Sequence, residues 1–125
     1  MNYLSLEEIL RLHFQIVEDF GGSHGVRDEG RLISVVNVPS QVVFGQEQYK
    51  TVFDKAAVYI RNIIADHAFI DANKRTAITA GAIFIMRTEH QLIAKPQELE
   101  DFAVRVATDH LDIAAIASWL EGHSN

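Results

Sequence analysis

The sequence predicts an all-α fold of about six helices around a buried central helix. Apolar residues recur at helical spacing along most of the chain, and several of these segments begin at residues that commonly cap helices. The segment Ala77 to Met86 is apolar on nearly every side, which is typical of a helix surrounded by other helices. No segment has the pattern of a parallel sheet.

The composition predicts one globular domain over residues 1–125. The chain is 48% hydrophobic and 22% charged, too apolar for disorder, and a chain of this length can bury a single core. It has no cysteine, its longest apolar run, Ala80 to Met86, is too short to span a membrane, and Met1 to Leu10 lacks the basic region of a signal peptide. We therefore expect a cytoplasmic protein. The net charge of −6 argues against direct binding to nucleic acid or to an anionic membrane.

The first helix is predicted from about Ser5 to Phe20. Ser5 and Glu8 have the spacing of a capping box, and Gly21-Gly22 provides a left-handed stop. The residues expected on its buried face are Ile9, Leu10, His13, Ile16, Val17 and Phe20.

A second, short helix is predicted between Asp28, which can cap it, and Pro39. The segment Val38 to Tyr49 lacks a helical period and predicts an irregular loop or a small β-hairpin. Its apolar residues Val42, Val43 and Phe44 allow two interpretations. The simpler expectation is that they tuck under the loop into the core. The alternative is a flap whose backbone edge docks a peptide substrate as an added strand.

A third helix is predicted from Thr51 to about Ala65, and the central helix from near Asn73 to Met86. Gly81 in the central helix allows a neighbouring helix to approach closely. The wide apolar stripe of the third helix consists of Val52, Phe53, Ala56, Ala57, Ile60, Ile63 and Ile64.

The last third of the chain predicts two further helices from periodicity alone. Pro96 suits the first turn of a fifth helix, and Asp112 can cap a sixth that Gly122 closes. The apolar positions that define these helices are Leu99, Phe102, Ala103, Val106, Ile113, Ile116, Trp119 and Leu120.

The stretch Asp66 to Thr76 concentrates polar chemistry between two apolar segments. A loop from His67 to Ala72 leads into a helix start, whose free N–H groups and positive dipole end favour an anion. Asn73, Lys74 and Arg75 follow at this start. Because a cationic side chain opposes the helix dipole there, their placement indicates a bound phosphate.

Two residues of the loop can act on such a phosphate. Asp71 supplies the hard oxygen that Mg²⁺ prefers, and His67 suits a general base because histidine is the side chain type whose unperturbed charge change falls near operating pH. Phe69 is expected to point inward and anchor the loop. Together these residues indicate phosphoryl or nucleotidyl transfer from a nucleoside triphosphate. A structural ion-pair loop stays open, since the charges of Asp66, Asp71, Lys74 and Arg75 cancel.

The run His67-Ala-Phe-Ile-Asp71-Ala-Asn73-Lys74-Arg75 resembles the signature of the Fic/Doc superfamily, His-Pro-Phe-x-x-Gly-Asn-Gly-Arg in the Fic branch. Lysine at position 74 resembles the Doc (death-on-curing) toxin branch, which also tolerates Ala68 in place of proline. Three other stretches are similar to Doc-type proteins: Gly21-Gly22 with Gly25-Val26-Arg27-Asp28, the segment Pro39 to Gly45, and Lys55-Ala56-Ala57.

This resemblance implies a helical fold with the active site between two helices and ATP as co-substrate. In the Doc branch it implies a kinase, and the known target type is elongation factor Tu; in the Fic branch it implies AMP transfer to a protein hydroxyl. A small antitoxin that inserts a helix into a groove is the implied partner. By position, His67 would be the base, Asp71 the Mg²⁺ ligand, Asn73 an anion-hole donor, and Lys74 and Arg75 phosphate clamps.

A non-enzymatic interaction module is the third functional class left open. The remaining histidines show no metal-ligand spacing, and His13 is expected to be a hydrogen-bonded core histidine. Arg27 is expected to be a solvated loop residue, although it could reach a substrate.

Overall fold

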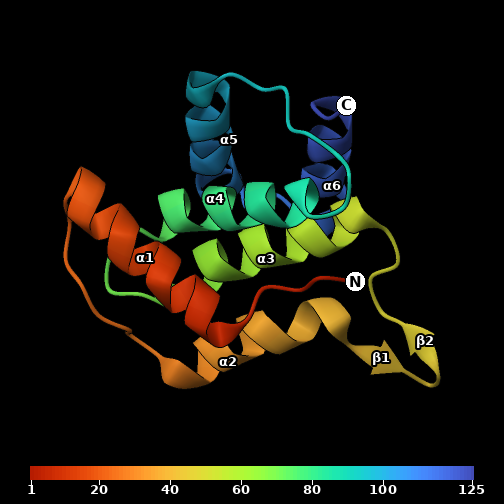
Figure 1. Cartoon of the computed structure of the whole chain (residues 1–125), viewed down its shortest axis with the longest axis horizontal. Helices are drawn as coiled ribbons and strands as arrows, with labels where there is room; N and C mark the ends of the chain where they lie inside the picture. The colour runs from red at the N-terminus through yellow and green to blue at the C-terminus, as the bar shows by residue number, and fades with distance from the viewer.

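The computed structural model describes residues 1–125 and confirms the all-α prediction: six α-helices pack together, with one small hairpin at the side (Figure 1). No helix is long and apolar enough to cross a bilayer. The elements are α1 (Leu6–Phe20), α2 (Glu29–Asn37), the 3-10 helix η1 (Val38–Ser40), β1 (Val42–Val43), β2 (Gln46–Glu47), α3 (Val52–Asp66), α4 (Asn73–Met86), α5 (Pro96–Thr108) and α6 (Ile113–Gly122).

The predicted caps are confirmed. The Ser5 hydroxyl accepts from the Glu8 N–H at 3.1 Å, and the Glu8 carboxylate accepts from the Ser5 N–H at 3.1 Å, which completes the capping box of α1. Asp28 caps α2, and Asp112 caps α6 by accepting from the Ala115 N–H at 2.8 Å. These helices therefore begin where short-range hydrogen bonding favours it.

The centre of the bundle is the pair α3 and α4, which run side by side through the middle of the molecule (Figure 1). They approach closely at Gly81, where an added Cβ would lie 2.5 Å from Cδ1 of Ile60, so the predicted close approach is confirmed. A single cluster of 23 buried residues draws on all six helices. The first turn of α4 is left exposed at Lys74 and Arg75, which frees it for a ligand.

The expectation that the hairpin residues tuck into the core is wrong. Val42, Val43 and Phe44 are 58%, 38% and 101% exposed. The two strands pair only with each other, and the turn between β1 and β2 projects away from the helices (Figure 1). Buried Lys55 of α3 anchors the hairpin by donating to the Glu47 carboxylate at 3.1 Å. Peptide docking at this exposed flap stays a prediction.

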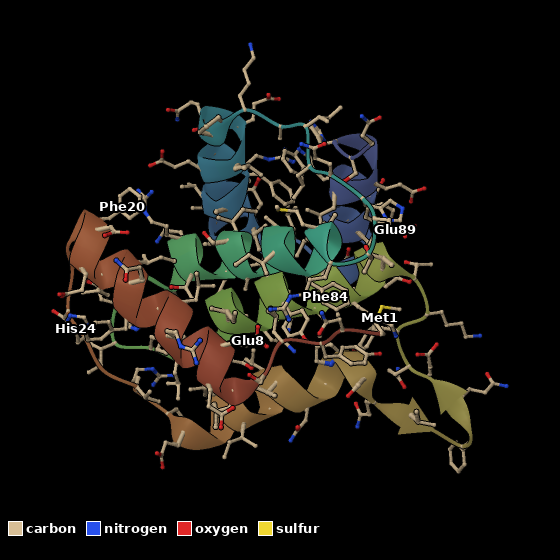
Figure 2. The ribbon with its side chains drawn as sticks, viewed as in Figure 1. Met1, Glu8, Phe20, His24, Phe84 and Glu89 are labelled. Atoms are coloured by element: carbon tan, nitrogen blue, oxygen red, sulfur yellow. The ribbon has the colours of Figure 1, made fainter.

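The face of α1 is also less completely buried than its periodicity predicts. Ile9, His13 and Val17 are buried, whereas Leu10 and Phe20 are exposed. Phe20 lies at the last turn of α1, beyond the core and on the side of α4 and α5 (Figure 2). Its ring contacts the guanidinium of Arg75, 4.0 Å from the ring centroid, so Phe20 belongs to the surroundings of the polar stretch.

Candidate active site

The loop between α3 and α4 has the predicted bounds and two left-handed residues. His67, which ends α3, has φ 47° and ψ 56°, and Ala72, which precedes α4, has φ 63° and ψ 25°. L-residues with a side chain adopt this conformation at a cost of roughly 1–2 kcal/mol. Contacts from the rest of the molecule must therefore hold the loop in this shape.

The inside of the loop is closed by Asn73 and Phe69. The Asn73 amide accepts from the Phe69 N–H at 3.0 Å and donates to the Phe69 carbonyl at 2.9 Å. Phe69 is buried, as predicted, and its ring stacks on His13 with the centroids 3.8 Å apart. The Phe69 side chain thus anchors the loop from within.

His13 is the hydrogen-bonded core histidine that the sequence predicts. Its Nε2 lies 2.9 Å from the Asp71 carbonyl oxygen and therefore carries the donated proton. Burial lowers the pKa of His13, partly offset by this bond, so the ring is neutral at physiological pH. A neutral His13 ties the middle of α1 to the far end of the loop.

The segment between α1 and α2 supports the loop from outside. The Gly25 carbonyl accepts from the Ile70 N–H at 3.0 Å, and the Ala68 carbonyl accepts from the Arg27 N–H at 2.9 Å. Gly22 has a positive φ of 112°, and an added Cβ would lie 2.9 Å from the Asp71 carboxylate, so glycine is required there.

Arg27 and Arg31 contact the end of α3. The Arg27 guanidinium donates from Nε to the His67 carbonyl at 2.7 Å and from a terminal nitrogen to the Asp66 carbonyl at 2.8 Å. Arg27 is exposed, as predicted for a solvated loop residue, but the sequence did not indicate these bonds to carbonyls about forty residues away in the chain. Asp66 forms an ion pair with Arg31 at 3.4 Å, a role that the sequence did not indicate.

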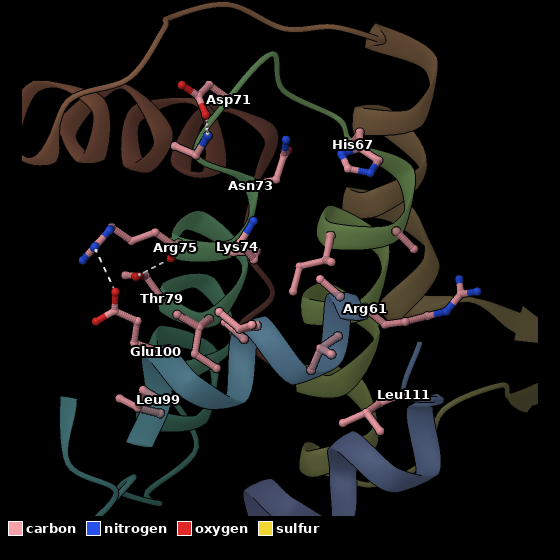
Figure 3. A pocket seen from close by; sticks show the side chains of 18 of the residues that line it. Arg61, His67, Asp71, Asn73, Lys74, Arg75, Thr79, Leu99, Glu100 and Leu111 are labelled. Atoms are coloured by element: carbon pink, nitrogen blue, oxygen red, sulfur yellow. Dashed lines mark hydrogen bonds and ion pairs between the residues drawn. The ribbon is translucent and has the colours of Figure 1, made fainter. Parts of the chain in front are cut away.

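A cavity of about 780 Å³ lies between the loop, the start of α4 and α5 (Figure 3). It brings together all the predicted site residues: His67, Asp71, Asn73, Lys74 and Arg75. Its other walls are apolar residues from three helices, including Ile64, Ile78, Leu99, Ala103 and Val106. The lining of the cavity therefore combines charged and polar side chains with apolar ones, as suits a ligand with both kinds of group.

The Asp71 carboxylate is ionised at this cavity. It accepts from the N–H groups of Ala72 at 2.8 Å and Ser23 at 3.1 Å, which hold its pKa below the usual value. No group of three or more His, Cys, Asp or Glu side chains converges to hold a metal. A single carboxylate beside a helix start with free N–H groups fits Mg²⁺, which commonly takes its other ligands from phosphates and water.

The start of α4 presents free donors to the cavity. The first helical N–H with an acceptor is that of Thr76, to the Ala72 carbonyl at 3.0 Å, which leaves the N–H groups of Asn73, Lys74 and Arg75 without one. Arg75 lies between Phe20 and Glu100, whose carboxylate is 3.9 Å from its guanidinium (Figure 3). This distance marks a loose ion pair, which an anion can replace.

The fold and the cavity define a helical protein with a cavity at a helix start whose N–H groups are free, lined by a histidine and a carboxylate. The model of the Fic/DOC family matches residues 3–85, from the N-terminal segment almost to the end of α4. The chain belongs to the Fic/DOC family.

The similarity to two relatives extends beyond the end of α4. The chain is 32% identical over 121 residues to a protein of Escherichia phage P1 named "Protein kinase doc", covering 96% of this chain and 94% of the phage protein. It is 38% identical over 105 residues to "Toxin Doc" of Mycolicibacterium smegmatis, covering 82% of this chain and 81% of that protein. The resemblance to the Doc branch is thereby confirmed.

Sequence reasoning alone did not identify several residues around the site. Phe20 and Glu100 carry no local signal, because a lone aromatic or acidic residue on a helix is common. Arg27 carried a weak signal, its position directly before the Asp28 cap. Its bonds to the end of α3 depend on how α2 packs against α3.

Proposed function

We propose that this protein is a Doc-type toxin that transfers the γ-phosphate of ATP to a Ser or Thr hydroxyl of a translation factor, elongation factor Tu, and so inhibits translation. The observation that carries the proposal is the single cavity that His67, Asp71, Asn73, Lys74 and Arg75 all line. Near full-length similarity to a protein named as a kinase supports the choice of reaction.

In this proposal His67 accepts the proton of the target hydroxyl as its oxygen attacks the γ-phosphorus. The bond between the γ-phosphorus and the bridging oxygen breaks, and ADP leaves. Asp71 would hold Mg²⁺, which supplies charge neutralisation at the phosphates. Lys74, Arg75 and the free N–H groups at the start of α4 bind the phosphate oxygens. Asn73 shapes the loop, and the second N–H of its amide nitrogen remains for a phosphate.

Transfer of AMP by the same residues is the second candidate, and Lys74 distinguishes the two. The Fic branch has glycine at this position. We infer that a lysine side chain occupies the space that a glycine leaves open and adds a charge, so that the triphosphate binds reversed and presents its γ-phosphate to the hydroxyl.

The direct test supplies elongation factor Tu with ATP labelled at either the γ or the α phosphate. Label from the γ position on the factor is the expected result, whereas label from the α position would establish AMP transfer. No transfer from either position, with the folded protein at high concentration, would leave only an interaction module. A His67→Asn variant run in parallel shows whether any label depends on the proposed site.

Lys74→Gly tests the role of the lysine. We expect weaker γ-phosphate transfer and the appearance of α-label, because the charge is lost and the space is opened. Lys74→Ala is the matched control, since it removes the charge without adding the backbone freedom of glycine to the first turn of α4. If Lys74→Gly changes neither activity, the assignment of the lysine is wrong.

We further propose that residues 1–125 act as one cytoplasmic domain and that a small antitoxin neutralises it. Similarity to two proteins named Doc supports this. The expected result is that expression of the chain alone arrests growth of a bacterial host, that co-expression of a small protein encoded beside its gene restores growth, and that His67→Asn causes no arrest.

A further inference from the structure

Three successive carbonyls at the end of α3 accept hydrogen bonds from one short segment. The Arg27 guanidinium donates to the carbonyls of Asp66 at 2.8 Å and His67 at 2.7 Å. The Ala68 carbonyl accepts from the N–H groups of Arg27 at 2.9 Å and Asp28 at 3.3 Å. The last carbonyls of a helix have no partner within it, and a cation there also complements the helix dipole.

These bonds lie on both sides of His67. The Asp66 carbonyl belongs to the peptide plane before His67, and the His67 carbonyl belongs to the plane after it. When both planes are held, φ and ψ of His67 are held as well, and with them the direction of its Cα–Cβ bond. Arg27 therefore restrains the backbone conformation that sends the imidazole to the cavity.

No other side chain donates a hydrogen bond to the carbonyls on the two sides of His67. Its imidazole makes no hydrogen bond within the protein, and its backbone is in the left-handed region at φ 47°. For a residue with a side chain this conformation is unfavourable by roughly 1–2 kcal/mol unless its surroundings hold it. Without the guanidinium, the end of α3 can relax and turn the imidazole away from the reacting hydroxyl.

We propose that Arg27 is a positioning residue for His67, acting through the two carbonyls and touching neither ATP nor the target. The proposal concerns the position of His67 in the cavity. Only its kinetic test rests on the proposed phosphate transfer. Arg31 provides a matched control. Arg31 also contacts the end of α3, where it pairs with the Asp66 carboxylate at 3.4 Å. It pairs with the Asp28 carboxylate at 3.3 Å as well, yet it donates to no carbonyl of the loop.

The kinetic test compares Arg27→Ala, Arg27→Lys and Arg31→Ala. Because misplacement of a reacting group by about 1 Å can lower a rate by about a hundredfold, we expect Arg27→Ala to lower kcat by roughly 10- to 100-fold with KM for ATP unchanged. Arg27→Lys should fall between that variant and the wild type, since an ammonium cannot present the parallel donors of a guanidinium. Arg31→Ala should have the same kcat as the wild type.

A second measurement does not need activity. The imidazole signals of the protein are recorded by NMR, and the His67 signal is identified by its loss in His67→Asn. We expect this signal to shift or broaden in Arg27→Ala and to stay in place in Arg31→Ala. If the wild type transfers no phosphate, the proposed function fails, while the NMR result still decides the role of Arg27.

Three results with the alanine variants would overturn the proposal. One is an unchanged His67 signal in Arg27→Ala; another is an equal loss of kcat in Arg31→Ala. The third is a raised KM for ATP at unchanged kcat, which would place Arg27 in contact with the nucleotide.

If Arg27→Ala does not fold, Arg27→Lys decides the question, because it keeps the charge and the backbone bond to Ala68 and changes only the donors. Wild-type kcat and His67 signal in that variant would then overturn the proposal.

Discussion

His67 combines an unfavourable backbone conformation with a free imidazole at the cavity. Such a combination persists only when surrounding contacts enforce it, and it is common at functional sites. The structure thus gives a physical reason, apart from any motif, to test this histidine for a role in the proposed transfer.

His67→Asn should lower phosphate transfer by about 10² to 10⁴, the usual contribution of a general base, and leave the thermal unfolding midpoint unchanged. Asparagine is the better substitution because it tolerates the left-handed region more readily than alanine. Transfer and unfolding are measured beside His24→Asn, a change at an exposed histidine outside the cavity. Full activity in His67→Asn would exclude the base assignment.

Ala72 is the other left-handed residue of the loop, with φ 63°. The Fic branch signature has glycine here, and the structure explains why, since glycine adopts this conformation without strain. We expect Ala72→Gly to raise the free energy of unfolding by about 1 kcal/mol, equivalent to a few degrees in Tm.

The control for this change is Ala82→Gly, within α4, where glycine should lower stability by about 1 kcal/mol. Both values come from denaturant unfolding followed by circular dichroism. A loss of stability in Ala72→Gly would show that the loop is not strained at this residue.

At the scale of elements, the site depends on the close packing of α3 against α4. Gly81 permits this approach, since a Cβ there would lie 2.5 Å from Cδ1 and 2.7 Å from Cγ1 of Ile60. The two helices carry the two ends of the loop, so their separation sets the distance between His67 and the free donors of α4. A change in their packing reaches the site directly.

Gly81→Ala should therefore lower the free energy of unfolding by roughly 1 kcal/mol, although the same change in an open helix stabilises by a similar amount. Ile60→Val should lower the free energy of unfolding less in the Gly81→Ala protein than in the wild type, because valine lacks the Cδ1 atom that is closest to the added methyl group. The four proteins of this double-mutant cycle are compared by denaturant unfolding. Additive effects of the two changes would contradict the predicted clash.

At the scale of the whole molecule, an ion pair between Glu8 and Arg87 joins the first turn of α1 to the end of α4. The Glu8 carboxylate accepts hydrogen bonds from Arg87 and from the Ser5 N–H. These bonds, above all those from Arg87, lower the pKa of Glu8 from 4.5 to about 2. Arg87 also donates to the Tyr3 carbonyl at 3.2 Å, which fastens the N-terminal segment.

The lowered pKa of Glu8 predicts a pH dependence of stability. The folded state favours the ionised carboxylate, so its contribution is complete above pH 4.5 and disappears as the pH falls toward 2. Wild type should exceed Glu8→Gln in unfolding free energy at pH 6, and the difference should shrink between pH 4.5 and 2.

Glutamine suits this comparison because it keeps the capping bond to the Ser5 N–H. Chemical unfolding at each pH measures the difference. A gap between the two proteins that does not change with pH would show that the ion pair contributes nothing beyond hydrogen bonding.

The sequence by itself determined the helices and identified the polar residues of the loop. Ser5, Asp28 and Asp112 cap helices through bonds within three residues, and the apolar period predicts most of the buried face of each helix, although Leu10 and Phe20 of α1 are exposed. The site residues from His67 to Arg75 are close in sequence, so a helix start after a short loop was enough to predict one shared site.

Only the tertiary structure decided what holds that site in place. Arg27 bonds to a carbonyl 40 positions away, and Ser23 reaches the Asp71 carboxylate across 48 positions. The position of Phe20 beside Arg75 and the exposure of Phe44 likewise depend on which helix lies nearby. Local patterns carry no information on such contacts, because they form only when distant helices pack together and bring their ends to the same place.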